Sequence, residues 1–278
     1  MYILAIETTG PFGSVSVADE TGKVLSYKVT TEEMSHMKNL IPMTGEALKE
    51  AGIEKKDLTH VACSIGPGSF TGVRVGVSTA RALCQVLEIP AVPVGTLDAF
   101  IMKPCKTRYI AAILNARRGQ VYGMVYDKEE ERFLLPPSAC MLTDVVECVE
   151  CNNIFGDLTY FGDGIDAYFE KDWQQKTLTK DGRNNLKKLA YAGDNVETSD
   201  ISDAVNKRNF DAEKMNHFAL KEDRYQDASS VAKYAAKFNV DAALEVKFSD
   251  LLPDYMRQAE AERKLENGEL NIKSMRVE

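Results

Sequence analysis

The amino-acid sequence predicts an α/β protein with two related lobes, each built on a mixed sheet that helices cover. Two observations support this prediction. Over residues 1–105 three strand-like segments precede alternating helices and strands, and strand-like segments begin again at Tyr109. Consecutive short strands favour an antiparallel meander, and right-handed crossovers through helices add parallel strands beside it. We therefore place the lobes at residues 1–105 and 106–278.

The first lobe opens with three short strands. Ile3–Glu7 is a short apolar run, and Ser14–Ala18 and Val24–Val29 alternate apolar with small or polar residues, which is the period of a strand. Tight, glycine-containing turns join the three segments. They predict an antiparallel meander.

Helices and strands alternate over the rest of this lobe. Met34–Ala51 has apolar residues at helical spacing and stops before Gly52, and Pro42 is expected to kink or break the helix. The elements that follow are strand Thr59–Ser64, a glycine loop, helix Ser69–Glu88, strand Ala91–Val94 and a short helix from Thr96.

The second lobe is less regular. Its expected elements are strands Tyr109–Leu114, Val121–Tyr126 and Thr159–Gly162 and helices Thr143–Cys151, Ile165–Gln175 and Ala228–Phe238. The segment Gln174–Asp227 is polar and lacks periodic apolar residues, which predicts a surface insertion. We expect Leu251–Tyr255 to be extended and Arg257–Gly268 to form a charged C-terminal helix that packs back on the first lobe.

Composition limits the function. Lys and Arg number 34 against 42 Asp and Glu, so the net charge is −8, and a chain that binds nucleic acid by itself usually presents a basic face. Four local basic residues are candidates for a minor contact with tRNA, namely Arg117, Arg118, Lys187 and Lys188. The longest apolar runs are too short for a membrane span, and the amino terminus lacks the pattern of a signal peptide. We predict a cytoplasmic protein without membrane contact.

The six cysteines are expected to be reduced and mostly buried. Cys148 and Cys151 have the spacing of a zinc or redox pair, but no second pair or nearby histidine completes four ligands. Packing on one helix face explains this spacing better.

A glycine loop is the strongest local signal. Gly66-Pro67-Gly68-Ser69-Phe70-Thr71-Gly72 follows a strand and opens a helix, where backbone N–H groups and the helix dipole favour an anion. Ser69 or Thr71 is also suited to cap that helix. An anion cradle and a tight turn with closely packed glycines both remain open. A Walker A loop is excluded, because no Gly-Lys-Ser/Thr follows.

The two long helices of the first lobe carry apolar residues around much of their circumference. A helix on a sheet needs only one apolar stripe, so the surplus predicts a second buried contact. Either a partner protein or the chain's own second lobe could provide it. The predicted partner interface consists of Met34, Met37, Ile41, Thr44, Leu48, Val73, Val77 and Arg81.

Three motifs resemble those of the bacterial TsaB (YeaZ) family. They are Ile3-Leu4-Ala5-Ile6-Glu7-Thr8-Thr9, Gly66-Pro67-Gly68-Ser69-Phe70-Thr71-Gly72-Val73-Arg74-Val75-Gly76 and Ile89-Pro90-Ala91-Val92-Pro93-Val94. The resemblance is dense over residues 1–127. It recurs at Phe161-Gly162-Asp163-Gly164 and near Leu252-Pro253-Asp254-Tyr255-Met256-Arg257, with little to match between residues 174 and 227.

The resemblance implies a fold and a function. The fold is a duplicated ribonuclease-H-like one, of the actin, sugar-kinase and Hsp70 type. The function is that of a non-catalytic scaffold and activator in the synthesis of N6-threonylcarbamoyladenosine at position 37 of tRNA. Such a subunit binds the TsaD-type catalytic subunit, is helped by a TsaE-type ATPase, pairs with itself when alone and contacts tRNA only indirectly. No intrinsic cofactor is expected, although ATP or ADP with Mg²⁺ could lie at a subunit boundary.

The resemblance also locates the metal ligands of the catalytic paralogue, a His-x-x-x-His pair. The corresponding residues are Thr96 and Phe100, which offer no imidazole, so metallopeptidase activity is not expected. Glu7 lies where a catalytic relative could hold Mg²⁺ through water, but the interpretation as a structural acid at a strand end is favoured.

The alternative function is that the chain is itself a nucleotide-binding enzyme of the kinase-like superfamily. The possible nucleotide or anion contacts are Glu7, Thr8, Gly66, Gly68, Ser69, Gly162 and Gly164.

Overall fold

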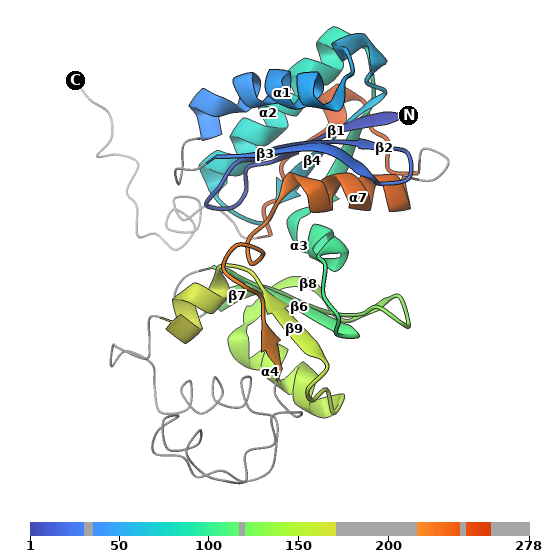
Figure 1. Ribbon diagram of the computed structural model, residues 1–278. Helices are drawn as coiled ribbons and strands as arrows, with labels where there is room; N and C mark the ends of the chain where they lie inside the picture. Colours follow the sequence, from blue (N-terminus) through green and yellow to red (C-terminus); the bar gives the residue numbers. More distant parts are fainter. Residues whose placement is uncertain (31–35, 117–119, 171–215, 240–242, 257–278) are drawn as a thin grey trace, which may run out of the picture.

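The computed structural model describes residues 1–30, 36–116, 120–170, 216–239 and 243–256 (Figure 1). These residues form two lobes, each centred on a five-stranded mixed sheet. The expected helix Arg257–Gly268, the basic residues Arg117, Arg118, Lys187 and Lys188, and most of the expected insertion lie outside the described residues.

The first sheet has the strand order β3-β2-β1-β4-β5. Its strands are β1 (Tyr2–Glu7), β2 (Ser14–Asp19), β3 (Val24–Val29), β4 (His60–Gly66) and β5 (Ala91–Gly95). β1 pairs antiparallel with β2 and parallel with β4. The predicted meander followed by parallel strands is confirmed.

Two helices cover one face of this sheet. They are α1 (His36–Ala51) and α2 (Phe70–Leu87), whose apolar sides join the sheet in one core. The expected break at Pro42 is wrong, because α1 runs through this residue without interruption. Pro42 is exposed.

The second sheet has the order β10-β9-β6-β7-β8. Its strands are β6 (Tyr109–Asn115), β7 (Gln120–Asp127), β8 (Arg132–Met141), β9 (Leu158–Phe161) and β10 (His217–Phe218). β6 pairs antiparallel with β7 and parallel with β9, as β1 does with β2 and β4. The two sheets therefore repeat one topology, which confirms the predicted duplication.

Two parts of the second sheet were not predicted. β8 is an edge strand that contains Pro136 and Pro137, and proline within a segment argues against a strand except at an edge. β10 lies inside the expected insertion Gln174–Asp227, where Asn216, Arg224 and Gln226 are also buried. The insertion boundary is therefore wrong for residues 216–227, because Phe218 and Ala219 pack into the apolar cores and the strand pairing of β10 holds the segment against β9.

Short helical elements complete the two lobes. α4 (Leu142–Cys151) packs on one face of the second sheet. The single-turn elements are η1 (Lys55–Asp57), α3 (Thr96–Ala99), η2 (Phe100–Met102), η3 (Asp166–Glu170) and η6 (Phe248–Asp250).

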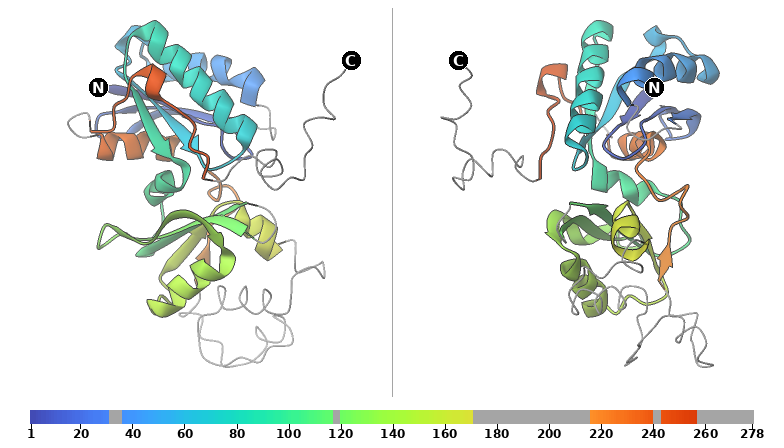
Figure 2. Two further views of the ribbon diagram at one scale, coloured as in Figure 1. Left: turned by 180° about the vertical axis from the view of Figure 1, so that it is seen from behind. Right: turned by 90° about the vertical axis from the view of Figure 1, so that its left-hand side faces the viewer.

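The last helix, α7 (Ala228–Phe238), does not stay with the second lobe as the predicted boundary implied. It packs on the first sheet, on the face opposite α1 and α2, and lies between the two lobes (Figures 1 and 2).

The segment 243–256 also returns to the first lobe. Val246 pairs with Ala91 of β5, and the backbone N–H of Asp254 donates to the carbonyl of Ile65 at 2.8 Å. Figure 2 shows this segment running beside α2. Within the described ranges, no helix is long and apolar enough to cross a membrane.

Candidate functional site

Glu7 lies at the corner where two parallel strands end. Because β1 and β4 are parallel neighbours, their carboxyl ends meet at one edge of the sheet, which brings Glu7 beside Ser64. The Glu7 carboxylate accepts hydrogen bonds from the backbone N–H of Thr9, from the Thr9 hydroxyl at 2.6 Å and from the Ser64 hydroxyl.

The carboxyl group of Glu7 is fully buried. Burial raises its pKa above the ordinary value, because the charged form loses its hydration, and the hydrogen bonds from Ser64 and Thr9 only partly oppose this shift. Hydrogen-bond donors therefore contact both carboxylate oxygens of Glu7. This arrangement supports the interpretation of Glu7 as a structural acid.

The glycine loop packs tightly against the same corner. The backbone N–H of Ser69 donates to the carbonyl of Thr9 at 2.8 Å, and the Thr8 hydroxyl donates to the carbonyl of Gly72 at 2.7 Å. Ser69 is the N-cap of α2, since its side chain accepts from the backbone N–H of Gly72 at 3.3 Å.

Close backbone approach explains the glycines. A Cβ at Gly72 would lie 1.9 Å from the carbonyl oxygen of Thr8, one at Gly68 would lie 2.6 Å from that of Thr9, and one at Gly66 would lie 2.3 Å from that of Asp254. Gly66 also has a φ of 122°, which favours glycine. Of the two interpretations left open by the sequence, these contacts favour the tight turn.

Gly162 and Gly164 lie in the other lobe, after β9. A Cβ at either position would approach the carbonyl oxygen of Ile113 in β6, at 2.2 Å and 2.6 Å. The loop is therefore a second closely packed turn in the repeated topology. The structure places these two glycines against β6 and the glycines of the first loop against the corner after β1.

The two residues aligned with histidines of the catalytic paralogue have packing roles. Thr96 is buried and its hydroxyl donates to the Thr9 hydroxyl at 3.3 Å. Phe100 is buried in the core between the lobes. Within the described part of the chain, no three His, Cys, Asp or Glu side chains cluster in a way that could hold a metal ion.

The predicted partner interface needs correction. Thr44, Leu48, Val73 and Val77 are buried against the chain's own first sheet and are not available to a partner. The sequence shows how much of a helix is apolar but not which stripe faces the sheet. Arg81 is half-buried and Ile41 is 60% exposed. Met34 and the Met37 side chain lie outside the described part of the chain.

The outward faces of α1 and α2 do carry the apolar surplus. Ile41, Phe70 and Val86 are exposed there, and Val86 is 80% exposed. The charged residues of α2 are Arg74 and Arg81, with no carboxylate among Phe70–Leu87. We call the exposed residues Ile41, Phe70, Arg74, Ala82 and Val86 the outer helix face.

The C-terminal segment adds to this face. Tyr255 packs against Phe70 with 5.0 Å between ring centroids, and the Arg74 guanidinium lies 3.7 Å from the Phe70 centroid. Arg74 also donates to the Tyr255 hydroxyl at 2.9 Å. Sequence reasoning missed this contact, because residues 70 and 255 are far apart along the chain.

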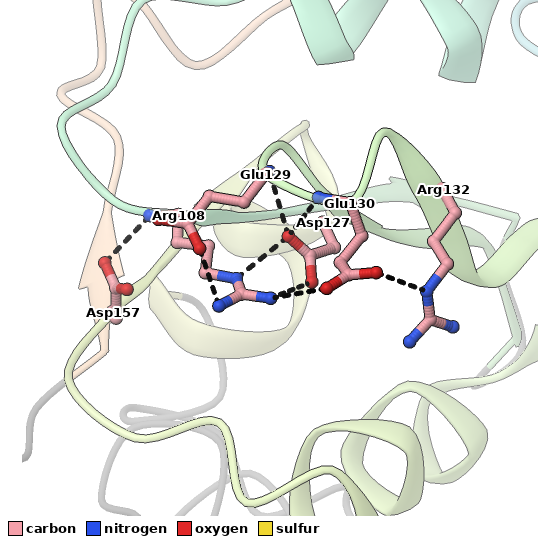
Figure 3. Close-up of polar contacts among 6 residues, drawn as sticks. All are labelled: Arg108, Asp127, Glu129, Glu130, Arg132 and Asp157. Atoms are coloured by element: carbon pink, nitrogen blue, oxygen red, sulfur yellow. Dashed lines mark hydrogen bonds and ion pairs between the residues drawn. The ribbon is translucent and has the colours of Figure 1, made fainter.

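A charged cluster lies where β6 begins and β7 ends (Figure 3). Arg108 makes two hydrogen bonds to Asp127, at 2.9 and 2.6 Å, and an ion pair with Glu129 at 2.7 Å. Hydrogen bonds from Arg108 hold the pKa of Asp127 below its ordinary value. The carboxylates engage Arg108, so this arginine adds no free basic surface for nucleic acid.

Comparison with known proteins gives a family match over most of the chain. The family model described as "TsaD: tRNA N6-adenosine threonylcarbamoyltransferase" matches residues 23–265. The tRNA threonylcarbamoyladenosine biosynthesis protein TsaB of Escherichia coli (strain K12) is 34% identical over 134 residues, which are 47% of this chain and 57% of that protein. TsaB of Bacillus subtilis (strain 168) is 30% identical over 153 residues, covering 54% of this chain and 66% of that protein. The matched part is thus less than two thirds of either relative.

Solved structures support the fold. An uncharacterised protein from Pseudomonas aeruginosa with similarity to peptidase YEAZ superposes with a TM-score of 0.65 and 20% identity, over 92% of this chain and 99% of that one. YeaZ from the same organism gives a TM-score of 0.60 at 20% identity, over 91% and 99%. At this identity the likeness concerns the fold alone.

Proposed function

We propose that this chain, which belongs to the family described as "TsaD: tRNA N6-adenosine threonylcarbamoyltransferase" and is similar to TsaB proteins, is a non-catalytic scaffold and activator subunit for synthesis of N6-threonylcarbamoyladenosine in tRNA. Its proposed main partner is a TsaD-type catalytic subunit in the cytoplasm. A TsaE-type ATPase is a further proposed partner, and tRNA would be contacted only indirectly, in keeping with the net charge of −8.

The outer helix face carries this proposal. Ile41, Phe70 and Val86 are exposed large apolar side chains on two neighbouring helices, and Phe70 packs against Tyr255, which favours a binding surface. A TsaD-type subunit would bury this face. In the absence of that subunit, a second copy of the chain would cover it.

Co-expression with the TsaD-type subunit of the same organism, followed by size exclusion, tests the proposal. A charge at Val77 would disrupt the core, so the informative variants are Ile41→Asp and Val86→Asp, both at exposed sites. We expect the double variant to fold, to lose co-elution and to lose self-association. Leu220→Asp is the matched control, because Leu220 is 65% exposed but follows β10 and belongs to neither α1 nor α2. Unchanged co-elution of the double variant would refute the proposed interface.

We also propose that any ATP or ADP with Mg²⁺ is held at the boundary with the partner. Close backbone contacts of Gly66, Gly68 and Gly72 with Asp254, Thr9 and Thr8 favour a tight turn at the glycine corner, which supports a nucleotide site elsewhere. Calorimetry with Mg²⁺ and ATP should detect binding to the complex but not to the chain alone. Sub-millimolar binding and turnover by the isolated chain would instead favour the kinase-like alternative.

A further inference from the structure

The two lobes share one layer of helices. α7 lies against the first sheet through small side chains, while Tyr234 and Phe238 of the same helix reach the core of the second lobe. α3 and η2 do the same, since Leu97, Phe100 and Ile101 pack against the second sheet. The layer between the lobes is therefore apolar core for both of them.

The chain passes between the lobes twice in the described structure. It leaves the first lobe after η2, along residues 103–108, and it returns along residues 219–227 to begin α7. We call these segments the two crossings. Relative motion of the lobes requires the backbone of both crossings to change.

A buried ion pair joins the crossings. Lys103 Nζ of the first lies 2.5 Å from Asp227 Oδ2 of the second, and the two side chains are only 5% and 13% exposed. Charges so well removed from water cost a large desolvation free energy unless each has its partner. Separating the crossings would leave two buried charges unpaired.

Asp227 is held from the helix side as well. It is the N-cap of α7 and accepts hydrogen bonds from the backbone N–H of Ser230 at 2.8 Å and from the hydroxyls of Ser229 and Ser230. The next backbone N–H, that of Ala228, donates to the Ser14 hydroxyl of β2 at 2.9 Å. The carboxylate thus ties the first crossing to the start of α7 and, through it, to the first sheet.

We propose that the Lys103–Asp227 ion pair is an interlobe clamp: it joins the two crossings where both leave the first lobe, so that they act as one double connection and restrict the angle between the lobes. The clamp acts together with the apolar layer, which resists separation but has no directional bonds to set the angle between the lobes. This inference is independent of the partner face. A chain without the outer helix face would still be clamped.

The decisive variant is Lys103→Met with Asp227→Asn, which removes the ion pair without leaving a buried charge. Asparagine still caps α7. Hydrogen exchange should become about tenfold or more faster in residues 103–108 and 219–227, while the strands of both sheets keep their protection.

Lys237→Met is the matched control. Lys237 of α7 pairs with Glu131 of the second lobe at 2.6 Å, so it also bridges the lobes, but both side chains are exposed. This variant should exchange like the wild type. Wild-type exchange in both crossings of the double variant, or an equal acceleration in Lys237→Met, would overturn the clamp.

If the double variant does not fold, the wild-type chain decides the question through amine labelling. A clamped Lys103 should react with an acylating reagent only as fast as the whole protein unfolds, whereas Lys237 reacts at the rate of an exposed amine. Labelling of Lys103 faster than global unfolding would show that the crossings separate in the native state and would overturn the proposal.

Discussion

The two lobes have the same strand order, yet they use the end of the first strand differently. In the first lobe β1 ends at Glu7, which is buried and hydrogen-bonded on both oxygens. In the second lobe β6 ends at Asn115, which is exposed. Shared topology has therefore kept the backbone arrangement, while the chemistry of the corner has diverged.

The glycine turns after the fourth strand of each sheet are the conserved part of this comparison. Gly66 and Gly68 approach backbone carbonyls at one corner, and Gly162 and Gly164 approach the carbonyl of Ile113 at the other. The element that follows differs. In the first lobe it is the long helix α2, which carries the outer helix face, and in the second it is the turn η3, where the described range ends at residue 170. Among the described residues, the outer helix face thus belongs to the first lobe.

Filling the glycine corners should give the largest effects. Gly72→Ala would place a Cβ 1.9 Å from a backbone oxygen that cannot move away, so we expect a loss of more than about 3 kcal/mol in the free energy of unfolding. Gly164→Ala meets Ile113 at 2.6 Å and should cost about 1–2 kcal/mol. Urea denaturation measures both.

Gly45→Ala is the matched control for these variants. Gly45 lies in α1 with nothing within 4 Å of an added Cβ, so alanine should stabilise the protein by up to about 1 kcal/mol. Equal losses in the free energy of unfolding for Gly72→Ala and Gly164→Ala would show that the two corners are equally constrained, and would contradict the expected difference between the lobes.

The strand ends should give the next largest difference. Glu7→Ala leaves the Thr9 N–H and the hydroxyls of Thr9 and Ser64 buried without their acceptor, at an expected cost of about 2 kcal/mol. Asn115→Ala removes an exposed side chain whose Oδ1 accepts from the Tyr168 hydroxyl at 3.3 Å, but that hydroxyl also has the Gln120 carbonyl at 3.0 Å, so the variant should stay within about 0.5 kcal/mol of the wild type. Thermal unfolding of the two variants at the same pH checks the contrast, and a costly Asn115→Ala would contradict it.

Local patterns were sufficient to predict most of the fold. Period-two alternation placed β1 to β3, and the glycines and the Ser69 cap placed the start of α2, because these signals depend on neighbouring residues. The edge strands β8 and β10 of the second sheet were not predicted. β8 contains prolines, and β10 is only two residues long and is held by pairing with β9.

The candidate site was predicted less well, for a different physical reason. Helical periodicity identifies an apolar stripe, but burial depends on how the helix is rotated on its sheet, so Val73 and Val77 were placed outside when they face inward. Contacts between distant segments left no local signal. Tyr255 on Phe70 and Lys103 with Asp227 are such contacts, because each joins residues more than 100 positions apart.

The smallest effect concerns the buried acids, and it depends on pH. Burial, with a contribution from Asp254, raises the pKa of Asp98 in the first lobe to about 6, and burial also raises the pKa of Asp163 in the second. A carboxyl whose pKa is higher in the folded state stabilises the fold fully below its unfolded pKa of about 3.8, and this contribution is lost as the pH rises through about 6. At neutral pH, Asp98→Asn removes the free-energy cost of burying the charged carboxylate. Because Asp98 is partly exposed, we expect a gain of about 1 kcal/mol at pH 7 and none below about pH 4.

Asp163→Asn is the counterpart in the second lobe, and its effect should be smaller. The Asp163 carboxylate accepts from the backbone N–H of Asn115 at 2.9 Å, and this bond favours the charged form and offsets part of the desolvation. Thermal unfolding from pH 4 to 8 separates the cases. A larger pH-dependent gain for Asp163→Asn than for Asp98→Asn would contradict this expected order. The buried carboxylate of the second lobe would then cost more free energy of unfolding than that of the first.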